Sequence, residues 1–145
     1  MTDTIITNDG TTEIITEASV INVVPAGGGS NESAPCGEII SGHLAVVMIA
    51  GLLYMANPTN PAHAGKVVGM AAQSGSQIGA VIEYVSLGDL GAFGTVLTQD
   101  DFYFVGLGGA PSTTQKAPGA VWWQYLGFAK DSATMHVDPG PAVTF

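Results

Sequence analysis

The sequence predicts an all-β protein, a small barrel or sandwich with two pseudo-repeated halves, preceded by an extended N-terminal arm. Three observations support this prediction. Of the 145 residues, only 10% are charged, 46% are apolar and 20 are glycine, a composition natural for short strands joined by turns. Turn signals recur at strand-length intervals from Gly37 onward. Finally, one glycine-centred strand pattern occurs twice.

The turn signals delimit the candidate strands. Segments such as NPTNP, QSGSQ and GLGGAPS are rich in the residues that favour turns. Regular short strands between such turns indicate a sandwich or a small barrel. The candidate strands are 44–49, 52–55, 66–71, 80–85, 93–97, 102–105, 121–129 and 133–137.

The repeated pattern consists of the segments KVVGMA and QYLGFA. Aligning them places Gly69 on Gly127 and, further towards the N-terminus, Gly51 on Gly109, so that both glycine pairs are 18 residues apart. A glycine inside a strand permits a bulge or the close approach of a neighbouring backbone. We therefore interpret the four glycines as structural residues at equivalent corners of two halves.

Residues 1–37 differ from the rest and predict an arm and linker before a β-domain of residues 38–145. They hold no basic residue, and PAGGGSNESAPCG is typical of a flexible linker. The β-prone runs 5–7 and 13–24 have few neighbours with which to pair. We expect either a disordered terminus or an arm that a partner orders. Its apolar residues are candidate interface residues: Ile14, Ile15, Val20, Ile21, Val23 and Val24.

The charge balance argues against two classes of partner. Twelve acidic residues stand against three lysines and no arginine, giving a net charge of -9. Binding of nucleic acids and of anionic membranes depends on lysine and arginine. The longest apolar run, 44–56, is too short to span a bilayer, and the N-terminus has no signal-peptide pattern. Cys36 is alone, so an intrachain disulfide is excluded. We expect a soluble protein made in the cytoplasm.

The residues that could carry chemistry are scattered. His43, His63 and His136 show no metal-ligand spacing; His63 is expected in a turn and His136 on the solvent side of a strand. Asp100 and Asp101 are adjacent carboxylates, but they favour a turn before a strand rather than an acid–base pair. Neither a nucleophile elbow nor a phosphate-binding loop is present. The sequence predicts no enzyme, no catalytic residue, no metal and no cofactor.

Trp122 and Trp123 lie next to each other on a predicted strand and should point to opposite faces. One ring should enter the core, and the other should lie outside, where an exposed tryptophan marks a contact surface. Both are candidate interface residues. A protein interface is favoured over sugar stacking because aromatic residues dominate interface cores. A carbohydrate-binding β-domain is the alternative from another class.

Four segments follow one another in a characteristic order: SGHLAVVMIAGLLYMAN, AHAGKVVGMAAQSGSQIGAVIEYVSLG, LTQDDFYFVGLGGAPSTT and WWQYLGFAKDSATMHVD. In this order residues 41–145 resemble β-rich modules of tailed-phage virions, the capsid decoration (cement) proteins and related head-fibre or tail-fibre modules. Those modules usually have glycine where this chain has Asp101, and the acidic arm is not part of their pattern.

The resemblance implies a virion structural protein that binds the outer surface of the major capsid protein shell and stabilises it. Such modules commonly act as homotrimers, so a homotrimer on the capsid surface is implied, with the arm reaching neighbouring subunits. The alternative within the same class is a head-fibre or tail-fibre attachment module, with the arm as its anchor.

Overall fold

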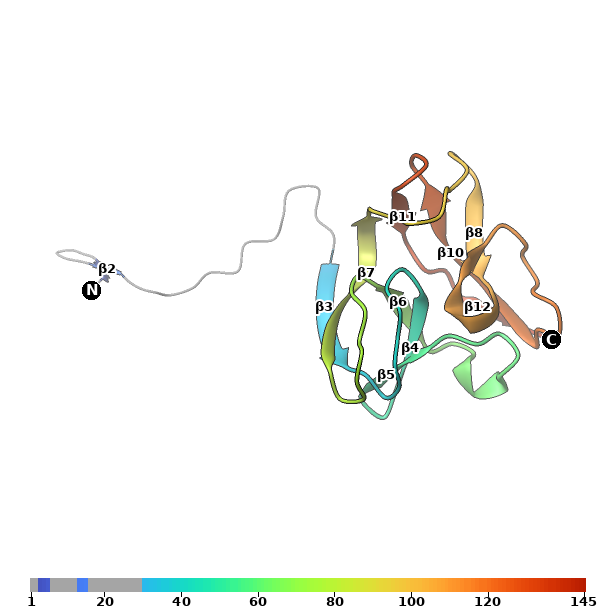
Figure 1. The fold of residues 1–145 in the computed structure, drawn as a ribbon, viewed down its shortest axis with the longest axis horizontal. Coiled ribbons are helices and arrows are strands. Elements are labelled where there is room, and N and C mark those ends of the chain that lie inside the picture. The colour runs from blue at the N-terminus through green and yellow to red at the C-terminus, as the bar shows by residue number, and fades with distance from the viewer. Residues whose placement is uncertain (1–2, 6–12, 16–29) are drawn as a thin grey trace.

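The computed structural model describes residues 3–5, 13–15 and 30–145 and shows an almost entirely β protein (Figure 1). Strands β1 (Asp3–Ile5) and β2 (Glu13–Ile15) pair antiparallel as a two-stranded sheet. The other described strands join one curled antiparallel sheet, which confirms the predicted fold class. Helical turns in the described residues are the short 3-10 segments η1 (Pro61–His63) and η2 (Leu107–Gly109). No helix among these residues has the length and apolar character needed to cross a membrane.

The large sheet consists of two halves with the same plan. The first half contains β4 (Ala45–Ile49), β5 (Leu52–Met55), β6 (Val67–Ala71) and β7 (Val81–Leu90). The second contains β8 (Phe102–Val105), β9 (Pro111–Ser112), β10 (Trp122–Ala129) and β11 (Met135–Val137). The order across the sheet is β5-β4-β6-β7-β11-β10-β8-β9, so the second half repeats the first in reverse. The two halves meet where β7 pairs with β11, and the predicted pseudo-repeat is confirmed.

The repeated glycines occupy equivalent places in these halves. Gly69 of β6 lies against β7, and a Cβ there would overlap the carbonyl oxygen of Val85. Gly127 of β10 lies against β11, and a Cβ there would overlap the carbonyl oxygen of His136. The strand pairing shifts register beside each of them, as expected at a bulge. Both glycines therefore let two strands approach where the sheet bends.

The earlier glycine of each pair lies in the hairpin of its half. Gly51 forms the turn between β4 and β5 with φ 81°, and Gly109 ends η2, between β8 and β9, with φ 83°. This left-handed conformation favours glycine because glycine has no Cβ. The stretch containing η2 is thus a hairpin connection.

Strand β3 (Ser30–Pro35) closes the first half into a small barrel. It pairs with β7 from Ser30 opposite Leu87 to Pro35 opposite Val81. The next residue, Cys36, bridges Leu53 of β5, and the Gly37 N–H donates to the Leu53 carbonyl oxygen at 2.8 Å. The wall formed by β5, β4, β6, β7 and β3 therefore returns to β5, and Figure 1 shows β3 beside β7 on this side of the domain.

This strand corrects the prediction that residues 1–37 are arm and linker. Residues 30–37 belong to the barrel, where Ala34 and Cys36 are buried. Their small and polar composition resembles a linker, but pairing with β7 and burial order the strand, because tertiary contacts override weak β-propensity. Apart from β1 and β2, the rest of the predicted arm lies outside the described residues.

We expect the Cys36 thiol to resist modification in the native protein. The residue is 0% exposed, and burial raises the pKa of its thiol, which lowers the reactive thiolate fraction. Maleimide labelling at neutral pH should therefore follow global unfolding across a urea series. Rapid labelling in native buffer would show that β3 is not docked.

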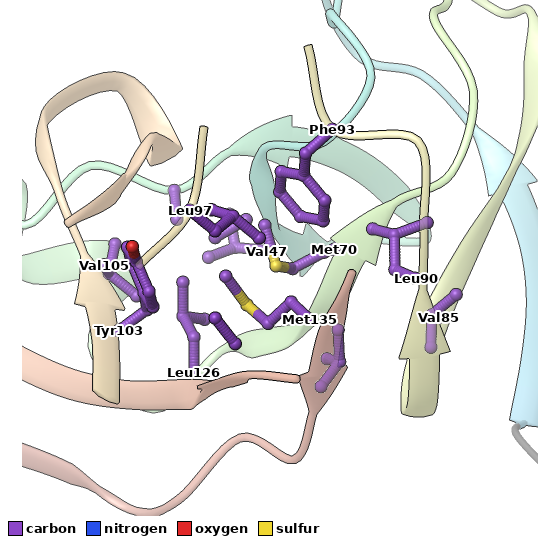
Figure 2. Packing of buried hydrophobic residues seen from close by; sticks show 14 of the residues in the cluster. Val47, Met70, Val85, Leu90, Phe93, Leu97, Tyr103, Val105, Leu126 and Met135 are labelled. Carbon is purple, nitrogen blue, oxygen red and sulfur yellow. The ribbon is translucent and has the colours of Figure 1, made fainter. Parts of the chain in front are cut away.

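Two hydrophobic cores lie on the two sides of the first-half sheet. Strand β4 is buried on both faces, because Val47 contributes to one core and Val46 to the other. The smaller core fills the barrel and contains Leu53 and Ile82. The larger core lies between the halves, and Figure 2 shows side chains from both, such as Met70 and Leu126, gathered there.

One predicted strand is absent, and besides β3 the short strands β9 and β12 (Ala142–Thr144) were not predicted. Residues 93–97 form a loop fixed over the core at both ends: the Phe93 N–H donates to Ala133 at 3.1 Å and the Leu97 N–H to Ser132 at 2.9 Å. Both side chains are buried while those between them are exposed, which mimics a strand pattern. Strand β12 pairs with β10. The other predicted strands are present, and β7 extends beyond its predicted end to Leu90.

Candidate protein-binding face

Aromatic side chains line the outer face of β8 and β10. Neighbouring residues of a strand point to opposite sides of a sheet, and the core residues of these strands alternate with half-buried or exposed ones. Tyr125 of β10 is paired with Phe104 of β8, which brings the outward-facing rings of the two strands together. We call this group the aromatic strip: Phe102, Phe104, Trp123 and Tyr125.

The rings of the aromatic strip form one continuous row. The ring centroid of Phe104 lies 5.8 Å from that of Trp123 and 6.0 Å from that of Tyr125, which lies 5.8 Å from Phe102. All three pairs are edge-to-face, with interplanar angles of 74° to 79°, an arrangement that stabilises aromatic pairs beyond their burial. Phe102 is nevertheless 62% exposed. The strip is therefore an ordered apolar surface that solvent can reach.

Carboxylates border the strip. Asp101 immediately precedes Phe102 and is exposed. Asp138 follows β11 and is also exposed; burial, together with the nearby negative charge of Asp138, raises the pKa of Tyr125. We call Asp101 and Asp138 the acidic rim. The aromatic strip therefore has exposed carboxylates near two of its residues, Phe102 and Tyr125.

A polar cluster joins the two halves where β7 meets β11. Asp89 of β7 lies 2.7 Å from the Lys130 ammonium and 3.0 Å from Nδ1 of His136, which pairs with it across the strands. Hydrogen bonds from Lys130 and His136 lower the pKa of Asp89. His136 lies on the solvent side between two buried residues, as predicted, and its ring centroid is 5.4 Å from that of Phe128. Lys130 is therefore already engaged by a carboxylate.

The structure separates the two tryptophans as predicted. Trp122 is 0% exposed, and its Nε1–H donates to the Asn60 carbonyl oxygen at 2.9 Å. Trp123 is half-buried in the aromatic strip. Trp122 is thus a core residue, which corrects its place among the candidate interface residues. Of the candidates in the arm, Ile14 and Ile15 belong to β2. The remaining candidates lie outside the described residues: Val20, Ile21, Val23 and Val24.

The sequence did not lead to a prediction for Phe102, Phe104 and Tyr125. A signal existed, because the phenylalanines of β8 are two residues apart, as are Trp123 and Tyr125 of β10. That spacing places each pair on one face of its strand. The pairing of β8 with β10, which unites the pairs into one strip, cannot be inferred from spacing within either strand.

His63 is a buried histidine of η1 and has a structural role. It is 9% exposed, and the Asn57 N–H donates to its Nδ1 at 3.0 Å. Nδ1 must be unprotonated to accept this bond. Burial lowers the pKa of His63, partly offset by the negative charge of Glu38. The neutral imidazole thus holds the connection between β5 and β6, and the predicted turn position is confirmed.

We expect this histidine to make the fold less stable in mild acid. Its folded-state pKa lies below the unfolded value of about 6.5, so the unfolded chain binds the proton first. The free energy of unfolding should fall as the pH drops below about 6.5 and continue falling until the folded-state pKa is passed. Urea midpoints measured across this range should decline less in His63→Gln, whose amide oxygen can still accept a bond. Parallel profiles for the two proteins would contradict the assignment.

Two hollows lie apart from the aromatic strip. One, of about 560 Å³, lies beside η2 and is lined by residues that include Leu107, Ser112 and Lys116. The other, of about 420 Å³, lies beside His43 and Phe93. Asp100 and Asp101 form the predicted turn before β8. Across the described ranges, no three or more histidine, cysteine or acidic side chains are placed to hold a metal ion.

A comparison of the chain with models of known protein families finds no match, and a comparison with curated proteins also finds none. The features that bear on function are therefore the repeated fold, the aromatic strip and its acidic rim.

Proposed function

We propose that this protein is a capsid decoration (cement) subunit of a tailed-phage virion, which binds the outer surface of the major capsid protein shell and stabilises it. The observation that carries the proposal is the aromatic strip, a solvent-accessible row of rings in mutual contact. Isolated exposed aliphatic residues are ordinary, but a contiguous aromatic surface marks a protein contact.

The correspondence between the resembling segments and the repeated plan supports the phage class. The first segment forms the β4-β5 hairpin and the second forms β6 and β7. The third forms β8 with its hairpin connection, and the fourth forms β10 and β11. Two of the segments that resemble the virion modules thus form the first half of the sheet, and the other two form the second half.

Binding through such a face would stabilise a shell by linkage. A protein that binds the assembled shell, but not separate capsid subunits, shifts the equilibrium towards the assembled state. A standard interface buries about 800 Å² on each partner, and apolar area contributes about 25 cal/mol per Å² before the costs of association. Many copies, each with a modest interface, would together resist the internal pressure of packaged DNA. The homotrimer belongs to the same proposal, with the aromatic strip outside the contacts between its subunits.

The number of copies in the virion tests this function. Quantitative mass spectrometry of purified particles should find this chain in hundreds of copies, in a fixed ratio to the major capsid protein. A head-fibre or tail-fibre module would be present in about a dozen copies or fewer, as the symmetry of a tail requires. A count in that lower range, or absence from particles, would contradict the decoration role.

A sugar-binding role fits the geometry less well. Sugar sites usually combine an aromatic face with polar groups that converge in a hollow. No residue of the aromatic strip lines either of the two hollows described above. Binding on a glycan array that Trp123→Ala abolishes would support this alternative instead.

A further inference from the structure

We propose that the aromatic strip and the acidic rim form one docking face for a basic protein surface, with an apolar centre flanked by lysine or arginine. This inference rests on the proposed function, in which the surface belongs to the capsid shell. The strip supplies contact area, and the rim selects the charge of the partner. Charge disfavours two other candidate occupants, a second copy of this chain and its own N-terminal segment.

The charged residues near the strip and their contacts indicate the charge of the partner. Asp101 is exposed and precedes Phe102 in the chain, and Asp138 is close enough to Tyr125 for its negative charge to raise the pKa of that residue, so exposed carboxylates lie near two residues of the strip. Lys130, the cation nearest in sequence to Phe128 at this end of β10, is paired with Asp89. Lys116 lies 4.9 Å from the ring centroid of Phe145. Lys130 and Lys116 are therefore engaged elsewhere, and we infer that positive charge facing the rim comes from the partner.

A second copy of this chain is a poor occupant. In a two-fold interface the same patch faces itself, so two aromatic strips in contact would bring two acidic rims together. Like charges across an interface oppose binding. The chain carries a net charge of -9 and has no arginine with which to relieve this repulsion.

The chain's own N-terminal segment is a poor occupant for the same reason. This segment enters the fold at Ser30, opposite Leu87, and the next residue of β7, Gly88, pairs with Val137 of β11. Only β11 separates this part of β7 from β10. Residues 1–29 contain four carboxylates and no basic residue. Their charge opposes the acidic rim, although their apolar residues would suit the strip.

A basic partner surface can bind both the aromatic strip and the acidic rim. Arginine and lysine side chains bind aromatic rings through cation–π contacts, and nearby carboxylates can pair with the same groups. Complementary charge also makes association faster and sensitive to salt. The shell surface that receives this face should therefore carry lysine or arginine around an apolar patch.

The test measures binding of the full-length chain to purified shells, which are assembled from the encoding phage's major capsid protein without this protein. We expect Phe102→Ser to bind about tenfold more weakly or worse. Its matched control is Ile78→Ser, because Ile78 is 74% exposed but lies in the turn before β7, in the other half. This control should bind like the wild type.

A second pair of variants tests the charge of the partner. Asp101→Asn combined with Asp138→Asn should weaken binding about threefold or more at low salt and flatten its decline with increasing salt. Glu83→Gln removes an exposed carboxylate from the first half and should change little. Stronger binding by the double variant, or an unchanged salt dependence, would overturn the basic partner.

A photo-reactive phenylalanine analogue at position 102 identifies the occupant. On shells it should capture the major capsid protein. Capture of a second copy of this domain, or of residues 1–29, would overturn the inference. If the wild type binds shells and Phe102→Ser binds equally well, the docking face is overturned but the proposed function is not. If the wild type does not bind shells, both the proposed function and the docking face are overturned.

Discussion

Replacement of Gly127 by alanine should lower the free energy of unfolding by about 3 kcal/mol, because overpacking against rigid neighbours lies at the upper end of such effects. The added Cβ would overlap the carbonyl oxygen of His136, and the next nearest atoms also belong to the backbone of β11. Because no side chain can rotate away, β10 and β11 must separate. Gly69→Ala should lower the free energy of unfolding similarly, because a Cβ at this equivalent position would overlap the carbonyl oxygen of Val85 in β7.

Two other glycines serve as controls for this effect in urea unfolding. Gly94 has open space around its Cβ position and no positive φ, so Gly94→Ala should change stability by no more than about 0.5 kcal/mol. Gly51 also has open space, but its φ is 81°, so Gly51→Ala should cost about 1 kcal/mol through backbone strain alone. If Gly127→Ala were as stable as Gly94→Ala, the close approach of β10 and β11 would be wrong.

Replacement of Trp122 by alanine should lower the free energy of unfolding by about 3–5 kcal/mol, as expected for a large buried aromatic residue. The side chain is fully buried in the core between the halves. Its removal would leave a cavity and delete the hydrogen bond that the Nε1–H donates to the Asn60 carbonyl oxygen. Urea midpoints should show this loss directly.

The neighbouring tryptophan provides the matched comparison. Trp123→Ala removes a half-buried ring and its edge-to-face contact with Phe104, so it should cost about 1 kcal/mol. The same variant should weaken binding to shells, whereas Trp122→Phe should retain both the fold and the binding. A larger loss of stability in Trp123→Ala than in Trp122→Ala would contradict the assignment of the two faces.

Much of the fold could be predicted because the residues that specify its strands and turns lie close together in the sequence. Turn residues delimit the strands, and the spacing of Gly51 and Gly69 matches that of Gly109 and Gly127. The structure gives these glycines equivalent roles, since each half needs a tight hairpin and a close approach between neighbouring strands. A backbone requirement that only glycine meets leaves a clear mark in the sequence.

The features that were missed depend on contacts between distant segments. Strand β3 has the composition of a linker, and only its pairing with β7 and burial of Cys36 reveal it as part of the barrel. Residues 93–97 show an apolar pattern because Phe93 and Leu97 fix a loop over the core.

Only part of the candidate site was predicted, because the site also depends on contacts between distant segments. The tryptophan pair indicates one outward ring, and Trp123 is that ring. Its neighbours in the aromatic strip come from β8 as well as β10. Which strands become neighbours is decided by the two-fold arrangement of the whole sheet. A site built across strands is therefore visible only once the sheet is assembled.

The most direct test of the decoration role is an image reconstruction of the purified virion in which this domain can be placed in density. The proposal predicts copies arranged over the outer capsid surface, with β8 and β10 facing the major capsid protein. Density for the domain only at a fibre or tail, or on the capsid with Phe102 and Trp123 turned to solvent, would contradict it.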